Sequence, residues 1–208
     1  MSVVFTLDNM IFLLRGLGVT LVISLFTIFL SFIFGSILGI AKFVHHGFFS
    51  RFSILYIDCV RNIPLLLFII GFRFTLPLPP LVSAITAMTV FTSAMIAEIV
   101  IGGLNSIPRG QWEAAYSQGF SFVTTMIYIV LPQAVKKILK PLTGQFVTVI
   151  KDTSFCQVIA VTELMYSRII VMGKFVTGSQ VIMMYALLAV IYYVVNTALL
   201  ALSGKIKF

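Results

Sequence analysis

Two acidic side chains stand inside long apolar stretches of the sequence, where a charge is costly. Glu98 lies near the end of the apolar run 81–101, and Asp152 lies inside the apolar run 141–161. A carboxylate at the centre of a membrane helix costs about 2.5–3.5 kcal/mol on insertion scales, so such residues normally face a cavity and have a function. A ligand that carries an ammonium group needs such an acceptor wherever it leaves water. We therefore predict that Glu98 and Asp152 line a cavity for a small polar ligand.

Polar residues flank Asp152 along the chain. Gln145 and Thr148 share its helical face, and Thr153 and Ser154 follow it directly. The following pair suits a locally broken helix, the feature that builds binding sites near the membrane midplane in transporters. Lys151 points about 100° away from Asp152 on a helix, so it is poorly placed to neutralise that carboxylate. We predict that the four polar residues complete the site around Asp152.

A structural interpretation of the same charges stays open. In it, Lys151 or Arg61 neutralises Asp152, and Glu98 marks a helix end near the inner face of the membrane. Asp58 and Arg61 stand one helical turn apart, so they are expected to pair with each other at the membrane face.

The sequence contains no constellation typical of an enzyme. It has neither a Gly-x-x-x-x-Gly-Lys loop for phosphate nor a His-Glu-x-x-His pair for zinc. Cys59 and Cys156 stand in apolar surroundings, and His45 and His46 stand beside Lys42, as in a solvated loop. We expect no catalytic residue, no metal site and no cofactor in this chain.

The composition identifies the broad class of protein. Of 208 residues, 60% are hydrophobic and only 10% are charged, whereas a water-soluble domain carries roughly 25% charged residues. The formal net charge of +8 could indicate a nucleic-acid partner, but the basic residues lie near the ends of apolar runs, as they do in membrane proteins. We predict an all-α integral membrane protein with a single domain over residues 11–203.

The apolar runs predict about five transmembrane helices. They cover residues 16–41, 52–74, 81–101, 141–161 and 181–202, with a stiff proline-rich turn over 75–80. The run 120–132 is too short to span the bilayer and is expected to be interfacial or buried. Within the first span, Ser31, Gly35 and Gly39 recur every fourth residue and predict close contact with another helix.

Basic residues predict the orientation of these spans. If the N-terminus is outside, the inner segments hold Lys42, Arg51, Arg109, Lys136, Lys137, Lys140, Lys205 and Lys207. The outer segments then hold fewer, namely Arg15, Arg73, Arg168 and Lys174. The positive-inside rule therefore places the N-terminus outside and the C-terminus in the cytoplasm.

A long inner loop, about residues 106–132, carries a specific motif. Glu-Ala-Ala at 113–115 is followed by Gly119 and then by Ile-Val-Leu-Pro ending at Pro132. This pattern resembles the EAA loop of bacterial binding-protein-dependent ABC importers. Ser-Ile-Pro-Arg-Gly-Gln-Trp at 106–112 and Lys-Asp-Thr-Ser at 151–154 resemble, more narrowly, the permeases for polar amino acids. The resemblance covers nearly the whole chain.

The resemblance implies a fold like that of type I ABC importers and a transport function. It implies a permease subunit that forms the translocation pathway for polar amino acids with a second permease, identical or homologous. It also implies an extracytoplasmic binding protein and two ATPase subunits, which hold ATP and Mg. The loop would be a coupling helix that docks on the ATPase, with Glu113, Ala114, Ala115, Gly119 and Pro132 as the coupling residues.

The physical properties of the loop agree with docking. Ala114, Ala115 and Gly119 keep one side of a short helix thin enough to enter a groove. Glu113 near the helix start is placed where the helix dipole favours negative charge. The alternative for this loop is an ordinary amphipathic interfacial helix.

Two positions depart from the family pattern, and two other functions remain open. Arg61-Asn62-Ile63-Pro64-Leu65 replaces the usual Arg-Gly-Thr-Pro-Leu, and Ile101 stands where the family has an arginine. An ATP-independent solute channel would agree with the acidic spans, and a membrane scaffold would agree with the composition. Neither explains the spacing from Glu113 to Pro132.

Overall fold

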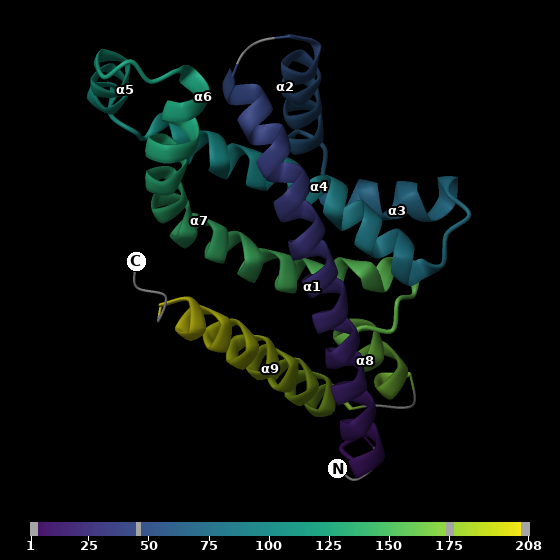
Figure 1. Ribbon diagram of the computed structural model, residues 1–208. Helices are drawn as coiled ribbons and strands as arrows, with labels where there is room; N and C mark the ends of the chain where they lie inside the picture. The colour runs from purple at the N-terminus through teal and green to yellow at the C-terminus, as the bar shows by residue number, and fades with distance from the viewer. Residues whose placement is uncertain (1–3, 45–46, 174–176, 205–208) are drawn as a thin grey trace. The chain divides into compact units, whose positions relative to one another are not determined.

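The computed structural model describes residues 4–44, 47–173 and 177–204, and every regular element in these ranges is a helix. Along the chain (Figure 1) the elements are α1 (Leu7–Val44), α2 (Gly47–Arg61), α3 (Leu65–Thr75), α4 (Pro80–Asn105), α5 (Arg109–Ser117), α6 (Phe122–Thr125), the π-helix η1 (Met126–Val130), α7 (Leu131–Asp152), the 3-10 helix η2 (Thr153–Ile159), α8 (Leu164–Met172) and α9 (Gly178–Gly204). Among the residues used above, His45, His46, Lys174, Lys205 and Lys207 lie outside the described ranges.

The helices confirm an integral membrane protein with four or five spans. Four segments are long and apolar enough to cross a bilayer: Leu7–Val44, Pro80–Asn105, Phe122–Ile159 and Gly178–Ser203. The pair α2 and α3 makes a fifth if it counts as one span. The predicted turn over 75–80 lies between the end of α3 and the start of α4.

The expected second span is not one straight helix. α2 and α3 meet at an angle of 104°. Pro64 caps α3 with φ −59° and ψ 136°, and a proline disfavours helical conformation in the residue before it. The run 52–74 therefore folds as two short helices joined through Asn62 and Ile63.

The expected fourth span is longer than predicted. The run 120–132 is not a separate interfacial segment, because Phe122–Ile159 forms one stretch of consecutive helices. Pro132 is the second residue of α7 and lies inside this stretch, where a proline removes one helical hydrogen bond. The backbone adapts just before it through η1, and the Gln133 side chain donates to the carbonyl of Ile129 at 2.8 Å.

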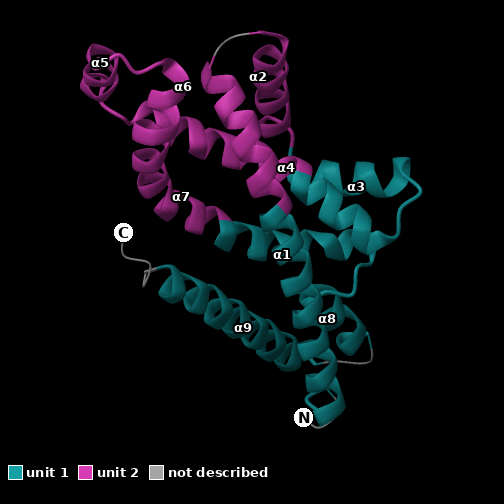
Figure 2. Cartoon of the chain, in the orientation of Figure 1, with its two compact units in different colours: residues 1–29, 64–89, 146–207 teal, residues 30–63, 90–145, 208 magenta. Residues whose placement is uncertain are grey.

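The chain forms two compact units, coloured in Figure 2. Among the described residues, unit 1 contains those within 4–29, 64–89 and 146–204, and unit 2 contains those within 30–63 and 90–145. In unit 1, the start of α1 packs with α8 and α9 through Leu13, Leu164, Met184 and Leu188, all buried.

In unit 2, α1 packs closely against α4 as the small residues predict. A Cβ added at Gly35 would lie 2.6 Å from the carbonyl oxygen of Ser93, and one at Gly39 would lie 2.7 Å from that of Ala97. Only glycine fits such an approach between helix backbones.

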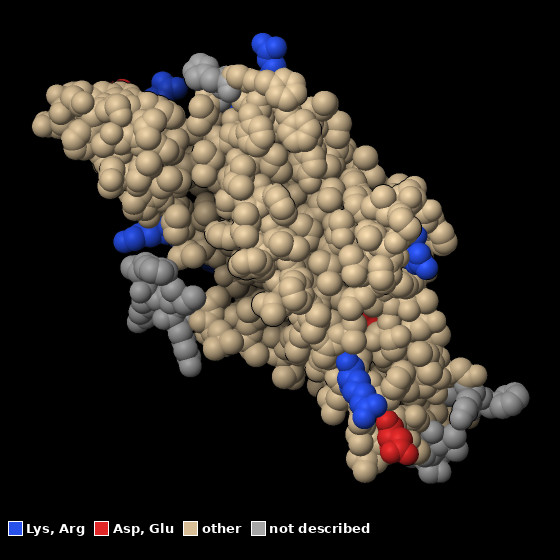
Figure 3. All heavy atoms as spheres, turned by 45° about the vertical axis from the view of Figure 1, so that its right-hand side comes forward, with Lys and Arg blue, Asp and Glu red and all other residues tan. Residues whose placement is uncertain are grey.

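The surface is apolar over broad areas, as a membrane protein requires. Large exposed side chains include Phe29 and Phe34 on α1 and Ile182, Tyr193 and Val194 on α9. Charged side chains are sparse on the face drawn in Figure 3. Contact with lipid or with other membrane subunits would remove such a surface from water.

Candidate functional site

The inner loop forms a short helix, α5, that ends in a glycine cap. Gly119 has a positive φ of 80°, its N–H donates to Tyr116 at 2.9 Å, and the N–H of Phe120 donates to Ala115 at 3.1 Å. These two bonds form a Schellman motif, which requires a left-handed residue just after the helix. A Cβ at Gly119 would meet nothing within 4 Å. Within this chain, Gly119 therefore serves the backbone conformation, not a shortage of space.

The predicted coupling residues differ in exposure. Glu113, Ala114, Gly119 and Pro132 are exposed, so they are available to a partner. Ala115 is only 3% exposed and packs within unit 2, so it does not belong to the outer side of α5. Glu113 is the fifth residue of α5, and the first turn holds no acidic residue. The prediction that the helix dipole stabilises Glu113 is therefore wrong, because α5 begins at Arg109 and Glu113 lies beyond its first turn.

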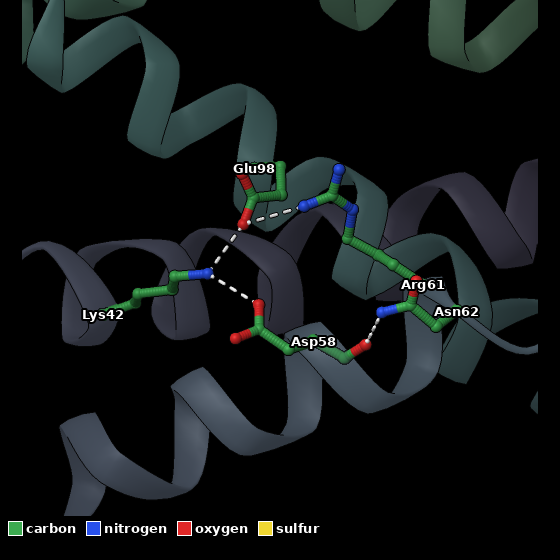
Figure 4. Close-up of polar contacts among 5 residues, drawn as sticks. All are labelled: Lys42, Asp58, Arg61, Asn62 and Glu98. Carbon is green, nitrogen blue, oxygen red and sulfur yellow. Dashed lines mark hydrogen bonds and ion pairs between the residues drawn. The ribbon is translucent and has the colours of Figure 1, made fainter.

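Glu98 belongs to a network of charges in unit 2 (Figure 4). Its Oε1 lies 2.8 Å from the Lys42 Nζ and 3.1 Å from the Arg61 Nη1. The Lys42 Nζ also lies 3.0 Å from the Asp58 Oδ1. Asp58 and Arg61 thus pair with Lys42 and Glu98, and not with each other as predicted. One residue comes from α1, two from α2 and one from α4.

This network balances the charge of Glu98 within the chain. It contains two cations and two carboxylates, and the Lys42 and Glu98 side chains are only 19% and 29% exposed. A cationic ligand at Glu98 would have to displace Lys42 and Arg61. The geometry therefore favours a structural role for Glu98. The expectation that Glu98 marks a helix end is wrong, because α4 continues to Asn105.

Asp152 has different surroundings, in unit 1. It is half-buried and is the last residue of α7, where the helix changes to 3-10 geometry. This is the local break predicted from Thr153 and Ser154. Among the described residues, no Lys or Arg lies within ion-pair distance of the Asp152 carboxylate.

The polar residues near Asp152 do not all face the same way. Thr153 is fully buried, and its hydroxyl donates to the carbonyl of Ile150 at 2.7 Å. Ser154 lines a cavity of about 170 Å³ with Lys151, Met165 and Tyr192.

The remaining predicted residues are divided between the units. Thr148 is half-buried in unit 1, and Gln145 is half-buried in unit 2, the unit of Glu98.

Sequence reasoning missed a third carboxylate, Glu163. It is 0% exposed and caps α8 by accepting from the N–H groups of Met165 at 2.8 Å and Tyr166 at 2.7 Å. Burial raises the pKa of the Glu163 carboxyl above its ordinary value of 4.5, although both N–H donors oppose the shift. The available signal was an acidic residue directly before an apolar helix, but glutamate is not a favoured cap, so the pattern is weak.

Comparisons with known proteins agree with this architecture. Residues 31–207 match the family described as binding-protein-dependent transport system inner membrane component. The chain is 38% identical over 205 residues to a protein of Bacillus subtilis (strain 168) named probable glutamine ABC transporter permease protein GlnP, covering 96% of this chain and 94% of that protein. It is 33% identical over 204 residues to the protein named probable glutamine ABC transporter permease protein GlnM of the same strain, covering 96% and 93%.

A solved structure shares the fold. The crystal structure described as an amino acid ABC transporter with histidines superposes with a TM-score of 0.88 at 23% identity, covering 98% of this chain and 96% of that one. The predicted type I importer-like fold is therefore confirmed.

Proposed function

The chain belongs to the family of inner membrane components of binding-protein-dependent transport systems, and from this premise we propose that it forms the translocation pathway of an ATP-driven importer for polar amino acids. The chain itself is a transport subunit and not an enzyme. ATP and Mg are held by a separate ATPase. The exposed helix α5 carries this proposal, because it offers that ATPase a docking element at the position of the EAA motif.

The proposed complex contains several subunits. Two permease subunits, identical or homologous, enclose the pathway, and two ATPase subunits dock on their α5 helices. An extracytoplasmic binding protein delivers the substrate. ATP binding draws the ATPases together, the α5 helices follow, and the pathway opens outward; hydrolysis returns it to the inward-facing state.

Within this chain, Asp152 is the stronger candidate for contact with the substrate. Glu98 already has two cations within 3.1 Å, whereas Asp152 has no such ion-pair partner among the described residues. Ser154, two residues along the chain, lines a cavity together with Lys151, Met165 and Tyr192. Relatives named as glutamine permeases make glutamine the first substrate to test.

The proposed orientation places the N-terminus outside and the C-terminus in the cytoplasm. α5 and the exposed lysines at the start of α7, Lys136, Lys137 and Lys140, are then on the inner side. This arrangement brings α5 to the compartment that contains ATP.

Reconstitution tests the proposal. The chain is purified with the ATPase that accompanies it, placed in proteoliposomes with the binding protein, and assayed for uptake of labelled glutamine and of each other amino acid. We expect uptake only with ATP and Mg. Uptake down a gradient without ATP would favour the channel, and no uptake of any amino acid would favour the scaffold.

A further inference from the structure

We infer that the last turn of α1 connects the coupling helix α5 to α2 and α4, and that Trp112 is the positioning residue that makes this connection. The inference rests on the proposed function, because it concerns how movement of α5 reaches the spans. Every residue in it belongs to unit 2.

The first step is a cluster of aromatic rings around Trp112 on α5. The Trp112 ring stacks on Phe43 of α1, with centroids 6.1 Å apart and planes at 26°, and on Phe122 of α6, at 5.8 Å and 20°. Tyr116, one turn further along α5, lies 6.4 Å from Trp112. Stacked rings at such distances hold a defined geometry. Trp112 therefore fixes α5 to the end of α1 and to α6.

The second step is the residue next to Phe43. Lys42 precedes it on α1 and binds Asp58 of α2 at 3.0 Å and Glu98 of α4 at 2.8 Å. Phe43 and Lys42 therefore give one helical turn two attachments, an aromatic one to the coupling helix and an ionic one to two further helices. A displacement of Trp112 that shifts this turn must also shift or break the ion pairs.

The connection is separate from the covalent chain. Along the backbone, α5 is joined only to α4 before it and α6 after it, and a side-chain bond from Gln133 to Gln111 at 3.1 Å adds α7. None of these contacts reaches α1. The Trp112–Phe43 stack does reach α1.

The test measures uptake per ATP hydrolysed in proteoliposomes that contain the whole complex. The Trp112→Ala complex should still hydrolyse ATP in response to the loaded binding protein. It should transport at least about five-fold less substrate per ATP, since five-fold is the lower end of typical coupling free energies. Trp112→Phe keeps a ring and should restore most of the ratio. Phe48→Ala is the matched control, since it removes an aromatic ring that is 85% exposed on α2 and should leave the ratio within about two-fold.

A double-mutant cycle decides whether Trp112 acts through Phe43. Phe43→Leu keeps an apolar side chain but removes the ring, so it is the variant to combine with Trp112→Ala. If the stack carries the coupling, the double variant is no worse than Trp112→Ala alone. A fully additive loss, or a wild-type ratio in Trp112→Ala, overturns the inference.

The inference and the proposed function fail separately. If the unaltered complex does not couple uptake to ATP, the proposed function is wrong and the inference falls with it. If the unaltered complex couples uptake to ATP hydrolysis and Trp112→Ala couples them equally well, only the inference is wrong. Should Trp112→Ala not assemble, Phe43→Leu provides the same ratio, and a normal value there also overturns it.

Discussion

Gly119 has two separable roles, one in the backbone of α5 and one in the proposed docking. Its φ of 80° penalises an ordinary L-residue by about 1–2 kcal/mol, whereas asparagine tolerates this conformation. Gly119→Asn should thus preserve the helix cap while adding a side chain at the docking surface, and Gly119→Val should damage both. We expect both variants to insert and to lose coupling of ATP hydrolysis to uptake, with lower thermal stability for valine alone. Normal coupling in Gly119→Asn would show that the cap is the only requirement.

The two intramembrane carboxylates should respond differently to neutralisation. Asp152→Asn removes the proposed partner of the substrate ammonium, so the half-saturation concentration for uptake should rise at least about 30-fold. If the binding protein sets saturation, the loss appears in the maximal uptake rate. Glu98→Gln instead removes the negative charge that pairs with Lys42 and Arg61. It should therefore lower the melting temperature of the complex. Wild-type transport in both variants would make the carboxylates structural, or would place the site in a homologous partner subunit.

Glu163 should make stability depend on pH. Burial raises the pKa of its carboxyl, so the folded state binds the proton more tightly than the unfolded state. The stabilisation is complete below the ordinary pKa of 4.5 and is lost as pH rises through the higher folded value. Glu163→Gln cannot ionise, so its thermal stability should change less with pH between 4.5 and neutrality than that of the unaltered chain. Identical pH profiles would contradict this assignment.

At the scale of the helices, the α1–α4 contact depends on glycine at particular positions. Any side chain at Gly35 would overlap the Ser93 carbonyl of α4. Such overpacking typically lowers the free energy of unfolding by about 1–3 kcal/mol. Gly18 lies on the same helix with nothing within 4 Å of its Cβ position, so it is the matched control. We expect Gly35→Leu to lower the melting temperature in detergent and Gly18→Leu to leave it nearly unchanged. Equal effects would mean that helix propensity, not packing, explains both.

The sequence predicts the helices that are long and apolar but not the way they bend. Hydropathy averages over the run 52–74 and conceals the angle of 104° that Pro64 produces. The run 120–132 is misjudged for the opposite reason: by itself it is too short to span the bilayer, but the helical stretch continues through Pro132 to Ile159.

Local spacing is a poor guide to the partners of charged residues. Asp58 and Arg61 are correctly placed on one helix, yet each pairs outside it, with Lys42 of α1 and Glu98 of α4. Those partners are 16 or more positions away along the chain, and only the packing of three helices brings them together. The coupling loop is only partly predictable: its short helix follows from the motif, but Gly119 ends the helix as a cap and Ala115 is buried, so neither belongs to the thin outer side on which both were expected.

For the whole molecule, the remaining prediction is the orientation in the membrane. The basic residues predict that α5 lies inside and that the segment before α9 lies outside. Single cysteines at Ser117 on α5 and at Thr177, both exposed, test this in a background without Cys59 and Cys156. In sealed cells, an impermeant thiol reagent should label position 177 and leave position 117 untouched.

Protection at Ser117 has a second possible cause, since a docked ATPase would also cover α5. Inverted membrane vesicles separate the two causes. With the ATPase stripped off, position 117 should react in these vesicles, and adding the ATPase back should protect it again, because a docked surface excludes the reagent. Position 177 should show the reverse dependence on vesicle orientation and no response to the ATPase. Labelling of position 117 in sealed cells would reject the orientation, and labelling in inverted vesicles that ignores the ATPase would reject docking at α5 while leaving the orientation intact.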